Sequence, residues 1–458
     1  MELKLSTHQK ALQINLDPAK YGVFAEIGAG QEVARWFFHV GGAAGTVAKS
    51  ISAYDMAVSD AIYGPAERYV SRQRLLAMLD YEFALLQQRL QATRGDRTEF
   101  FVYANTVATR SYSRRSDGHG WMGVRFQHAP GAAPSEIILH VWMRDPEAVR
   151  EQEAIGVLGV NLLHGAFYRR ANPSDLIAGL LDNLMRERIE IDLIRFDGPA
   201  FAGVDNRLMS LQLVEQGFTD ATMFTAQGEV VQPADLLYKR PILIERGSFR
   251  PITNLTHTIV ETARARFGVS DEPIVLLEMT LRQLQTGDRI DHTDFLARVD
   301  TLGTLGYTVM ISNYLRYHRL VPFLRRLTSH RIGFAMGLRN LKELFDERFY
   351  TDVPGGILQA LGQLFQGDVK LYVTPAIDPE SKLIVNPESY EPPRHLMHLY
   401  GHLIENQLIE TVSVPEELLR IYSRDVLEQI RRGDPRWESL VPPPVAAMIK
   451  QRHYFGCP

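Results

Sequence analysis

Polar residues of both signs follow the short apolar runs of this sequence, and their types suit proton transfer and anion binding. Histidine titrates near neutral pH, and beside a carboxylate it can exchange a proton with a substrate. We therefore expect His164, Asp197 and Glu278 to be catalytic residues. Arginines bind phosphate or carboxylate through paired hydrogen bonds, so we expect Arg195 and Arg339 to contact the ligand. The alternative is that these polar residues only mark where strands meet water.

A glycine turn near the N-terminus has the form of a strand, a tight turn and a helix. The segment 23–30 is apolar and ends in Gly28-Ala-Gly30, and residues 31–38 continue with helical spacing. Backbone N–H groups at such a helix N-terminus can hold an anion or a nucleotide, so Gly28 and Gly30 are candidate cofactor-binding residues. The segment resembles the first motif of methyltransferases that bind S-adenosylmethionine, with Asp55 as the acidic candidate. A purely structural turn is the alternative.

A second glycine-rich segment, Gly41-Gly-Ala-Ala-Gly-Thr-Val-Ala-Lys-Ser50, invites comparison with a phosphate-binding loop. Its spacing differs from that of the P-loop, because Ala48 stands where a glycine should precede the lysine. Lys49 is therefore a candidate phosphate ligand in a loosened version of that loop. The alternative is a flexible connection between two helices.

A histidine stripe near the C-terminus presents possible metal ligands. On a helix, His395, His398, His402 and Glu405 fall on one face, and imidazoles with a carboxylate can bind zinc or another divalent ion. An exposed stripe or an interface explains the same spacing. We therefore assign no metal ligand and leave the cofactor unknown.

The elements that must position these residues alternate between strands and helices. Such alternation predicts right-handed βαβ crossovers and a mainly parallel sheet. The expected strands cover 100–104, 136–143, 155–163, 189–196, 241–244, 274–278, 308–312, 332–336 and 369–373, and the expected helices cover 69–91, 175–187, 254–267, 292–305, 318–327 and 341–349.

The chain is expected to have three parts. Residues 1–95 form a helical N-terminal region with glycine-rich turns, residues 96–377 an α/β core, and residues 378–458 a helical C-terminal region with an apolar tail. The first core strands are joined by turns, so we expect an antiparallel start to the sheet. The strand count suits either a barrel or an open sheet, with a slight preference for the barrel-like form.

Composition excludes several classes of protein. The net charge of −4 argues against a nucleic-acid binder, and 45% hydrophobic residues are typical of a globular protein. The single cysteine, Cys457, permits no disulfide within the chain. We find no apolar run of the length needed to cross a bilayer and no secretory signal, so we expect a cytoplasmic protein without a membrane partner.

Several long segments resemble an uncharacterised bacterial family labelled nicotinate or nicotinamide mononucleotide adenylyltransferase. These segments are 24–35, 119–127, 158–162, 204–209 and 246–251. Mononucleotide adenylyltransferases resemble one another in an N-terminal strand followed by a His/Thr-x-Gly-His turn that holds the ATP phosphates, and in a late Ile-Ser-Ser-Thr-x-x-Arg segment. Here only Thr7-His8 stands near the N-terminus, and Ile311-Ser-Asn-Tyr-Leu-Arg316 partly matches the late segment.

We therefore expect a protein that binds a nucleotide or another phosphorylated small molecule, in its sharpest form a nucleotidyltransferase-like enzyme. The alternative is a self-assembling scaffold that has an enzyme-like fold without catalysis. In both cases a homo-oligomer is expected.

Overall fold

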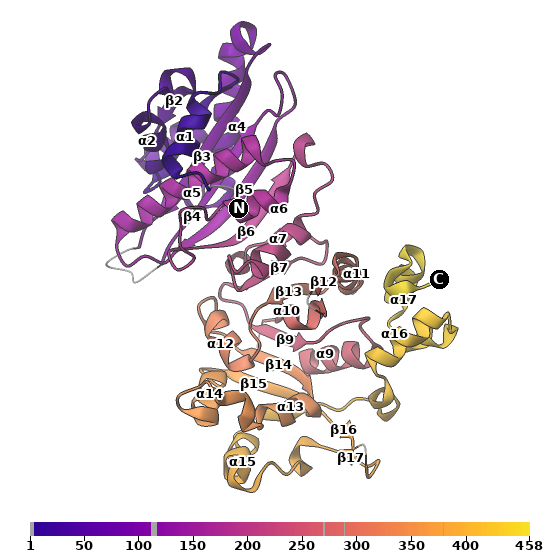
Figure 1. The fold of residues 1–458 in the computed structure, drawn as a ribbon. Coiled ribbons are helices and arrows are strands. Elements are labelled where there is room, and N and C mark those ends of the chain that lie inside the picture. Colours follow the sequence, from indigo (N-terminus) through magenta and orange to yellow (C-terminus); the bar gives the residue numbers. More distant parts are fainter. Residues whose placement is uncertain (1–3, 111–116, 269–270, 288, 379) are drawn as a thin grey trace. The chain divides into compact units, whose positions relative to one another are not determined.

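The computed structural model (Figure 1) describes residues 4–110, 117–268, 271–287, 289–378 and 380–458. The chain divides into two compact units, unit 1 (Met1–Asp220) and unit 2 (Ala221–Pro458). Each unit has its own sheet with helices packed against it, so the protein is a mixed α/β protein.

Unit 1 contains a six-stranded sheet in the order β2-β1-β3-β4-β5-β6. Strand β1 pairs in parallel with β2 and β3, and the remaining neighbours pair antiparallel, which confirms the antiparallel start expected for the core. The strands are β1 (Lys20–Gly28), β2 (Val47–Ile51), β3 (Glu99–Ala108), β4 (Gly118–Phe126), β5 (Ser135–Met143) and β6 (Ile189–Asp197).

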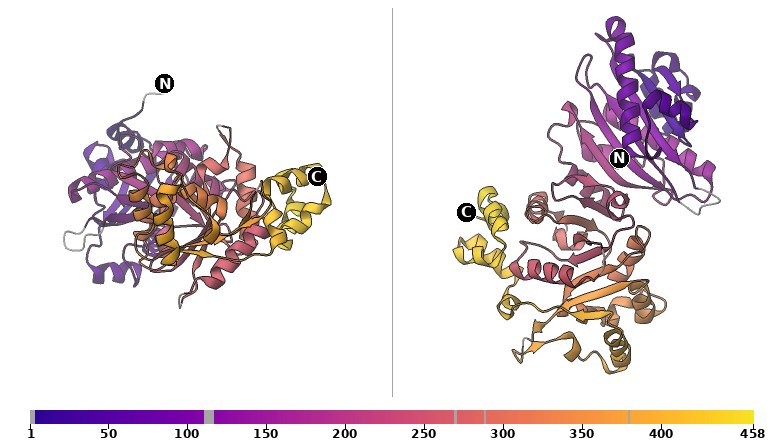
Figure 2. Two further views of the ribbon diagram at one scale, coloured as in Figure 1. Left: turned by 90° about the horizontal axis from the view of Figure 1, so that it is seen from below. Right: turned by 180° about the vertical axis from the view of Figure 1, so that it is seen from behind.

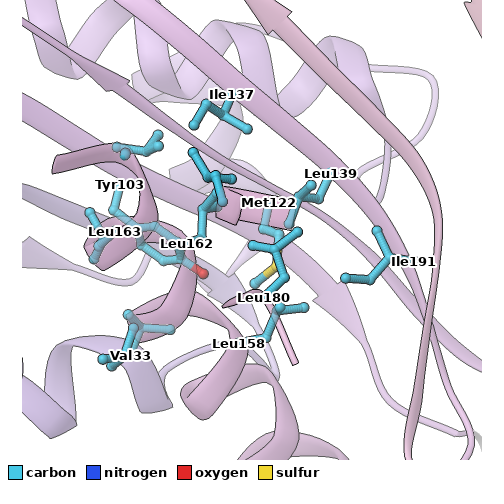
Figure 3. Close-up of a cluster of buried hydrophobic side chains, with 14 of the residues drawn as sticks. Val33, Tyr103, Met122, Ile137, Leu139, Leu158, Leu162, Leu163, Leu180 and Ile191 are labelled. Atoms are coloured by element: carbon cyan, nitrogen blue, oxygen red, sulfur yellow. The ribbon is translucent and has the colours of Figure 1, made fainter. Parts of the chain in front are cut away.

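Helices cover both faces of this sheet. On one face, Leu158, Leu162 and Leu163 of α5 pack with Met122 and Leu139 of the sheet (Figure 3). On the other face lies the long helix α4, visible in Figures 1 and 2. The helices of unit 1 are α1 (Thr7–Asn15), α2 (Glu32–His39), α3 (Met56–Tyr63), α4 (Arg72–Arg94), α5 (Ala148–Tyr168), α6 (Pro173–Gly179) and α7 (Asn206–Glu215).

The strand expected over 155–163 is wrong, because these residues belong to helix α5. Every residue from Leu158 to Phe167 is buried, including Asn161 and His164. A helix buried all round shows no alternation of polar and apolar residues, so its apolar run resembles that of a buried strand. His164 therefore stands within a helix and not at a strand end.

Unit 2 contains an eight-stranded sheet in the order β18-β15-β14-β9-β10-β13-β7-β8. The first six strands of this order are parallel to their neighbours, and β7 and β8 are antiparallel. The strands are β7 (Ala221–Phe224), β8 (Val230–Val231), β9 (Ile242–Arg246), β10 (Ile274–Thr280), β13 (Thr308–Ser312), β14 (Ile332–Gly337), β15 (Val369–Thr374) and β18 (Ile409–Thr411).

Helices also cover both faces of the sheet in unit 2. Helix α9 packs with Leu243 and Tyr372 on one face, and the helices that follow β13 and β14 pack on the other. The helices are α8 (Pro233–Leu237), α9 (Asn254–Arg266), α10 (Leu281–Leu284), α11 (His292–Gly303), α12 (Tyr317–Arg325), α13 (Leu338–Leu344), α14 (Gly356–Leu364), α15 (Met397–Glu405), α16 (Ser423–Arg432) and α17 (Pro443–Arg452). Two short ribbons, β11 (Gln285–Thr286) with β12 (Arg289–Ile290) and β16 (Ala376–Ile377) with β17 (Ile384–Val385), complete the unit.

The barrel-like preference is also wrong. In the described part of the chain the two main sheets are open, with β2 and β6 as the outer strands in unit 1 and β18 and β8 in unit 2. The compact units also differ from the boundaries expected at 95/96 and 377/378, because β1 pairs with β3 and β15 with β18 across them. Every helix that the structure describes is too short or too polar to cross a lipid bilayer.

Candidate functional site

The strand order of unit 2 defines a switch point between β9 and β14. From β9 the chain proceeds outward through β10 and β13, and it then returns to the other side of β9 and continues through β14, β15 and β18. This is the order of doubly wound folds, in which ligands bind outside the carboxyl ends of the strands where the order reverses. We therefore examined the residues at the carboxyl edge of this sheet.

An ion pair ties three strands together at this edge. Arg246 Nε and Nη2 at the end of β9 each donate a 2.8 Å hydrogen bond to the carboxylate of Glu278 in β10. The hydroxyl of Ser312, at the end of β13, donates to the same carboxylate at 2.6 Å. The sequence analysis singled out Glu278 among the polar residues that follow the apolar runs, and the structure brings it together with Arg246 and Ser312.

This pair is fully engaged with the protein. Glu278 is 0% exposed, and each of its oxygens accepts a hydrogen bond from Arg246. The remaining Nη1 of Arg246 donates to the Leu315 carbonyl at 3.1 Å, and the guanidinium stacks over Tyr317, 4.3 Å from the ring centroid. Both charges are thus occupied within the protein. The geometry suits a rigid support for a site better than direct contact with substrate.

A second carboxyl group lies at the same edge. Glu245 precedes Arg246 in β9, so its side chain lies on the opposite face of the sheet. Its Oε2 atom is buried without a hydrogen-bond partner in the described structure. Burial raises the pKa of Glu245 well above its usual range, which favours the neutral form of this side chain.

The loop after β9 is held by contacts of arginine side chains, and its Ser248 side chain is exposed. Arg298 of α11 donates to the Ser248 carbonyl at 3.1 Å, and Arg250 pairs with Asp294 at 2.6 Å. The side chain of Ser248 is exposed, and Thr253 caps helix α9 by accepting from the Thr256 N–H. Backbone N–H groups at the start of α9 therefore lie next to the switch point, where a phosphate group would be favoured.

Exposed polar side chains stand at two other strand ends of this edge. Asn313 follows β13 and is exposed. Arg339 follows β14, its side chain is 88% exposed, and within the described structure it pairs with Glu343 at 4.0 Å. Arg339 was expected to contact a ligand, and its position at the carboxyl end of β14 is compatible with that prediction.

The other predicted catalytic residues belong to unit 1. His164 Nε2 donates a 3.1 Å hydrogen bond to Gln13 Oε1 of α1, and burial lowers the pKa of His164 to about 4. Asp197, at the end of β6, pairs with Arg195 at 3.3 Å, and both side chains are largely exposed. Neither His164 nor Asp197 lies in the same unit as Glu278. Their catalytic roles remain predictions.

The glycine turn of unit 1 has the predicted strand-turn-helix form, with β1 ending at Gly28 and α2 beginning at Glu32. Both glycines are required by packing. Gly28 has a φ of +77°, and a Cβ there would lie 2.1 Å from the Val107 carbonyl oxygen. A Cβ on Gly30 would lie 2.0 Å from Asn105 Oδ1.

A buried carboxylate occupies the helix terminus at this turn. Glu26 accepts hydrogen bonds from the Val33 and Ala34 N–H groups of α2, at 3.2 and 3.0 Å. Asn105 joins this network by donating to Glu26 at 3.1 Å and to the Gly30 carbonyl at 2.9 Å. The chain therefore places its own carboxyl group where an anion or a nucleotide was expected to bind.

A cleft of about 470 Å³ nevertheless lies beside the turn, lined by Gly28, Ala29, Gln31, Glu32, Tyr54, Val107, Ala108, Thr109 and Gln152. Asp55, the acidic candidate after β2, caps helix α3 by accepting from the Val58 N–H. Lys49 lies in strand β2 and pairs with the buried Glu82, so the alternative of a helix–helix connection is wrong.

The side chains of the histidine stripe do not converge on one point. His395 lies in a short turn before α15 and pairs with Glu347 at 2.6 Å, and His402 contacts Asn406 within α15. Among the described residues, no group of three or more histidine, cysteine, aspartate or glutamate side chains has an arrangement that could hold a metal ion.

Sequence reasoning missed the importance of the turn that follows β9. We compared the His/Thr-x-Gly-His pattern with the N-terminus of the chain, whereas the first strand of the doubly wound sheet is β9. The loop after β9 ends at Thr253, and the segment that leads into helix α9 reads Thr253-Asn-Leu-Thr256. The apolar strand and the glycine at 247 were the signals that could have located it.

Comparison with known proteins gives partial similarities. No family model matches the chain, and no curated protein is significantly similar in sequence. The solved structures it resembles include the competence/damage-inducible protein CihA from Agrobacterium tumefaciens, with 19% identity over 36% of this chain and 97% of that chain at a TM-score of 0.25. A CinA superfamily protein from Enterobacter cloacae has 12% identity, over 36% of this chain and 95% of that chain, with a TM-score of 0.27. The nicotinic acid mononucleotide adenylyltransferase of Plasmodium falciparum has 10% identity, over 48% of this chain and 98% of that chain, with a TM-score of 0.24.

Proposed function

We propose that unit 2 binds a nucleotide at the carboxyl edge of its parallel sheet, between the ends of β9 and β14. The observation that carries this proposal is the reversal of strand order at this point, next to an open loop and a helix N-terminus. Ligands of doubly wound folds bind at such positions. Ser248, the first N–H groups of α9 and Arg339 would hold the phosphates.

The resemblance to adenylyltransferases allows the segment after β9 to be compared with the His/Thr-x-Gly-His turn of those enzymes. The turn after β9 keeps a threonine at Thr253, but Leu255 stands in the place of the glycine and Thr256 in the place of the final histidine. The nearest histidine, His257, contacts the Tyr307 hydroxyl at 2.7 Å. We therefore propose a nucleotidyltransferase-like unit that binds its nucleotide without the histidine that the family places at the phosphates.

The cleft beside Gly28 in unit 1 is a second candidate ligand site, favoured by its volume. Its acidic lining residue Glu32 and the carboxylate of Glu26 at the helix terminus disfavour a phosphate group there. A neutral ligand suits this cleft better than an anionic one.

Calorimetric titration of the full-length protein with ATP and with nicotinate mononucleotide, each in the presence of magnesium, tests the proposal for unit 2. We expect at least one of them to bind. Replacing Ser248 by glutamate should abolish binding, because it puts a negative charge at the phosphate position, whereas Ser248→Ala should retain it. The absence of binding by both nucleotides, or equal binding by Ser248→Glu, would contradict the proposal.

Arg339→Ala supplies an independent check. Loss of a charged hydrogen-bond donor to phosphate should weaken binding by about tenfold. Arg432→Ala is the matched control, since Arg432 is also exposed and pairs only within its own helix α16. Equal affinities of the two variants would remove Arg339 from the site.

A further inference from the structure

A buried chain of polar side chains crosses three strands of unit 1. Asp192 in β6 contacts His140 in β5, with 2.6 Å between Asp192 Oδ1 and His140 Nδ1. His140 Nε2 lies 3.4 Å from Nδ1 of His119 in β4. The other oxygen of Asp192 accepts a 2.8 Å hydrogen bond from the Trp142 indole N–H. None of these residues belongs to either candidate ligand site described above.

A β-bulge aims the carboxylate at the two rings. His140 pairs with Leu193 and Val141 pairs with Ile191, so Asp192 is an extra residue between two paired positions. Such a bulge re-aims a side chain and is frequent beside active sites. Here it lets one carboxylate contact both His140 and Trp142, which extend from the same face of β5.

The contacts define the tautomers of both imidazoles. An ionised Asp192 accepts hydrogen bonds only, so His140 carries its proton on Nδ1 and presents a lone pair on Nε2. His119 must then donate from Nδ1, which leaves the lone pair of His119 on Nε2. His119 is half-buried, and because its Nδ1 faces the buried His140, Nε2 lies on the side of the ring that points away from His140.

When His119 accepts a proton, the resulting positive charge need not stay on its own ring. Burial is the largest cause that lowers the pKa of His119 to about 4, and the nearby His140 is the second. A cation on this ring is therefore unfavourable. When Nε2 accepts a proton, however, the proton on Nδ1 can pass to His140 Nε2. The positive charge then lies on His140, beside the carboxylate of Asp192, where it is stabilised.

We propose that Asp192, His140 and His119 form a proton relay that makes His119 Nε2 a general base for a small molecule bound beside Trp142. The substrate would carry an ionisable O–H or N–H group. In the step, the substrate's proton bonds to His119 Nε2, the Nδ1 proton of His119 moves to His140, and the substrate keeps the electron pair as an anion. No further reactant is needed.

Two neighbours suit such a substrate. The rings of Trp142 and His119 lie 5.2 Å apart, and Trp142 is partly exposed, so a planar ligand could stack there. Arg68 is exposed and close enough to disfavour a cation on His119, and it would favour the anion formed by deprotonation. Among the described residues, Asp192, His140 and Arg68 are the charged or titratable groups that shift the pKa of His119.

Nitrogen NMR of the full-length protein with ¹⁵N-labelled histidine tests the relay directly. At pH 8 we expect His119 and His140 to carry their protons on Nδ1 and to have unprotonated Nε2 atoms. On acidification, the first proton taken up by the pair should appear as an imidazolium at His140. A proton on His119 Nε2 at pH 8 would overturn the proposal.

Reaction with diethyl pyrocarbonate tests the basicity of His119 Nε2, because transfer of its Nδ1 proton to His140 assists attack on the reagent. Replacing Asp192 by asparagine should slow modification of His119 by about tenfold or more, and modification of the exposed His330 should not change. Equal rates at His119 in wild type and Asp192→Asn would overturn the proposal.

Discussion

At the scale of single residues, two buried carboxyl groups of unit 2, Glu278 and Glu245, differ in whether they have an ionic partner. Glu278 is buried and paired with Arg246, so it supports the strand ends. Glu245 is buried without a partner at Oε2, so the neutral form is favoured. The carboxyl edge of the unit 2 sheet therefore contains both the ion pair of Arg246 with Glu278 and a buried carboxyl group, Glu245, with no partner at Oε2 in the described structure.

Replacing Glu278 by alanine should destabilise unit 2 strongly. The substitution leaves Arg246 buried without its counter-charge, which costs about 3–5 kcal/mol and corresponds to a fall of roughly 10 °C in melting temperature. Ser312→Ala removes only one hydrogen bond and should cost about 1 kcal/mol. Differential scanning calorimetry measures both, and similar losses in the two variants would show that the ion pair is not the principal support.

Glu26 should make the stability of unit 1 depend on pH. Burial raises its pKa from 4.5 to about 7, so between these values the folded protein binds more protons than the unfolded chain. Stability should therefore fall as pH rises from about 5 to about 7 and stay level above that range, with a maximum change of about 3 kcal/mol.

Melting curves between pH 5 and pH 8 measure this dependence. Glu26→Gln removes the titrating group and should flatten the part of the curve that belongs to unit 1. Asp197→Asn changes a largely exposed carboxyl of the same unit and is the control. A pH dependence that persists in Glu26→Gln would assign the effect to other groups.

Sequence reasoning located the right residue types but not all of their neighbours. Glu278 was identified as a candidate site residue, and its convergence with Arg246 and Ser312 follows from the parallel pairing of β9, β10 and β13. The relay of His119, His140 and Asp192 was not identified. Those residues lie on separate strands and meet through antiparallel register and a bulge, which the sequence does not show.

At the scale of elements, the glycine turn of unit 1 is held by side-chain contacts as much as by backbone conformation. Gly30→Ala would push a methyl group against Asn105 and disturb the network around Glu26, at a cost of about 1–3 kcal/mol. Gly203→Ala is the control, because a Cβ there meets nothing within 4 Å. Urea denaturation of both variants measures the difference, and equal stabilities would mean that Asn105 moves aside freely.

Five strands of unit 2 (β9, β10, β13, β14 and β15) could be predicted because each is a short apolar run bounded by turns, whereas β7, β8 and β18 were not predicted. Strand β13 matches its predicted range, and β10 and β14 extend only one or two residues beyond theirs. Helix α5 could not be predicted in this way. Gly156 and Gly159 allow it to pack closely against α2, so it is buried on all sides and loses the periodicity that marks a helix.

At the scale of the whole molecule, two compact α/β units share one chain, and the C-terminal tail belongs to the second. Tyr454 donates to Asp300 of α11, and Phe455 is buried, so the tail packs on its own chain. Packing of the tail therefore does not require a partner chain. The homo-oligomer expected from the sequence remains a proposal, and light scattering after size exclusion should give a multiple of the chain mass. A monomer that is stable to dilution would contradict it.

The most direct test of the central claim is hydrogen exchange of the full-length protein, measured by mass spectrometry with and without saturating ATP and magnesium. The switch-point account predicts slower exchange in residues 246–256 and 337–340 of unit 2 and unchanged exchange in residues 26–34 of unit 1. Protection of residues 26–34 instead, or no protection in either unit, would contradict nucleotide binding at the carboxyl edge of β9 and β14.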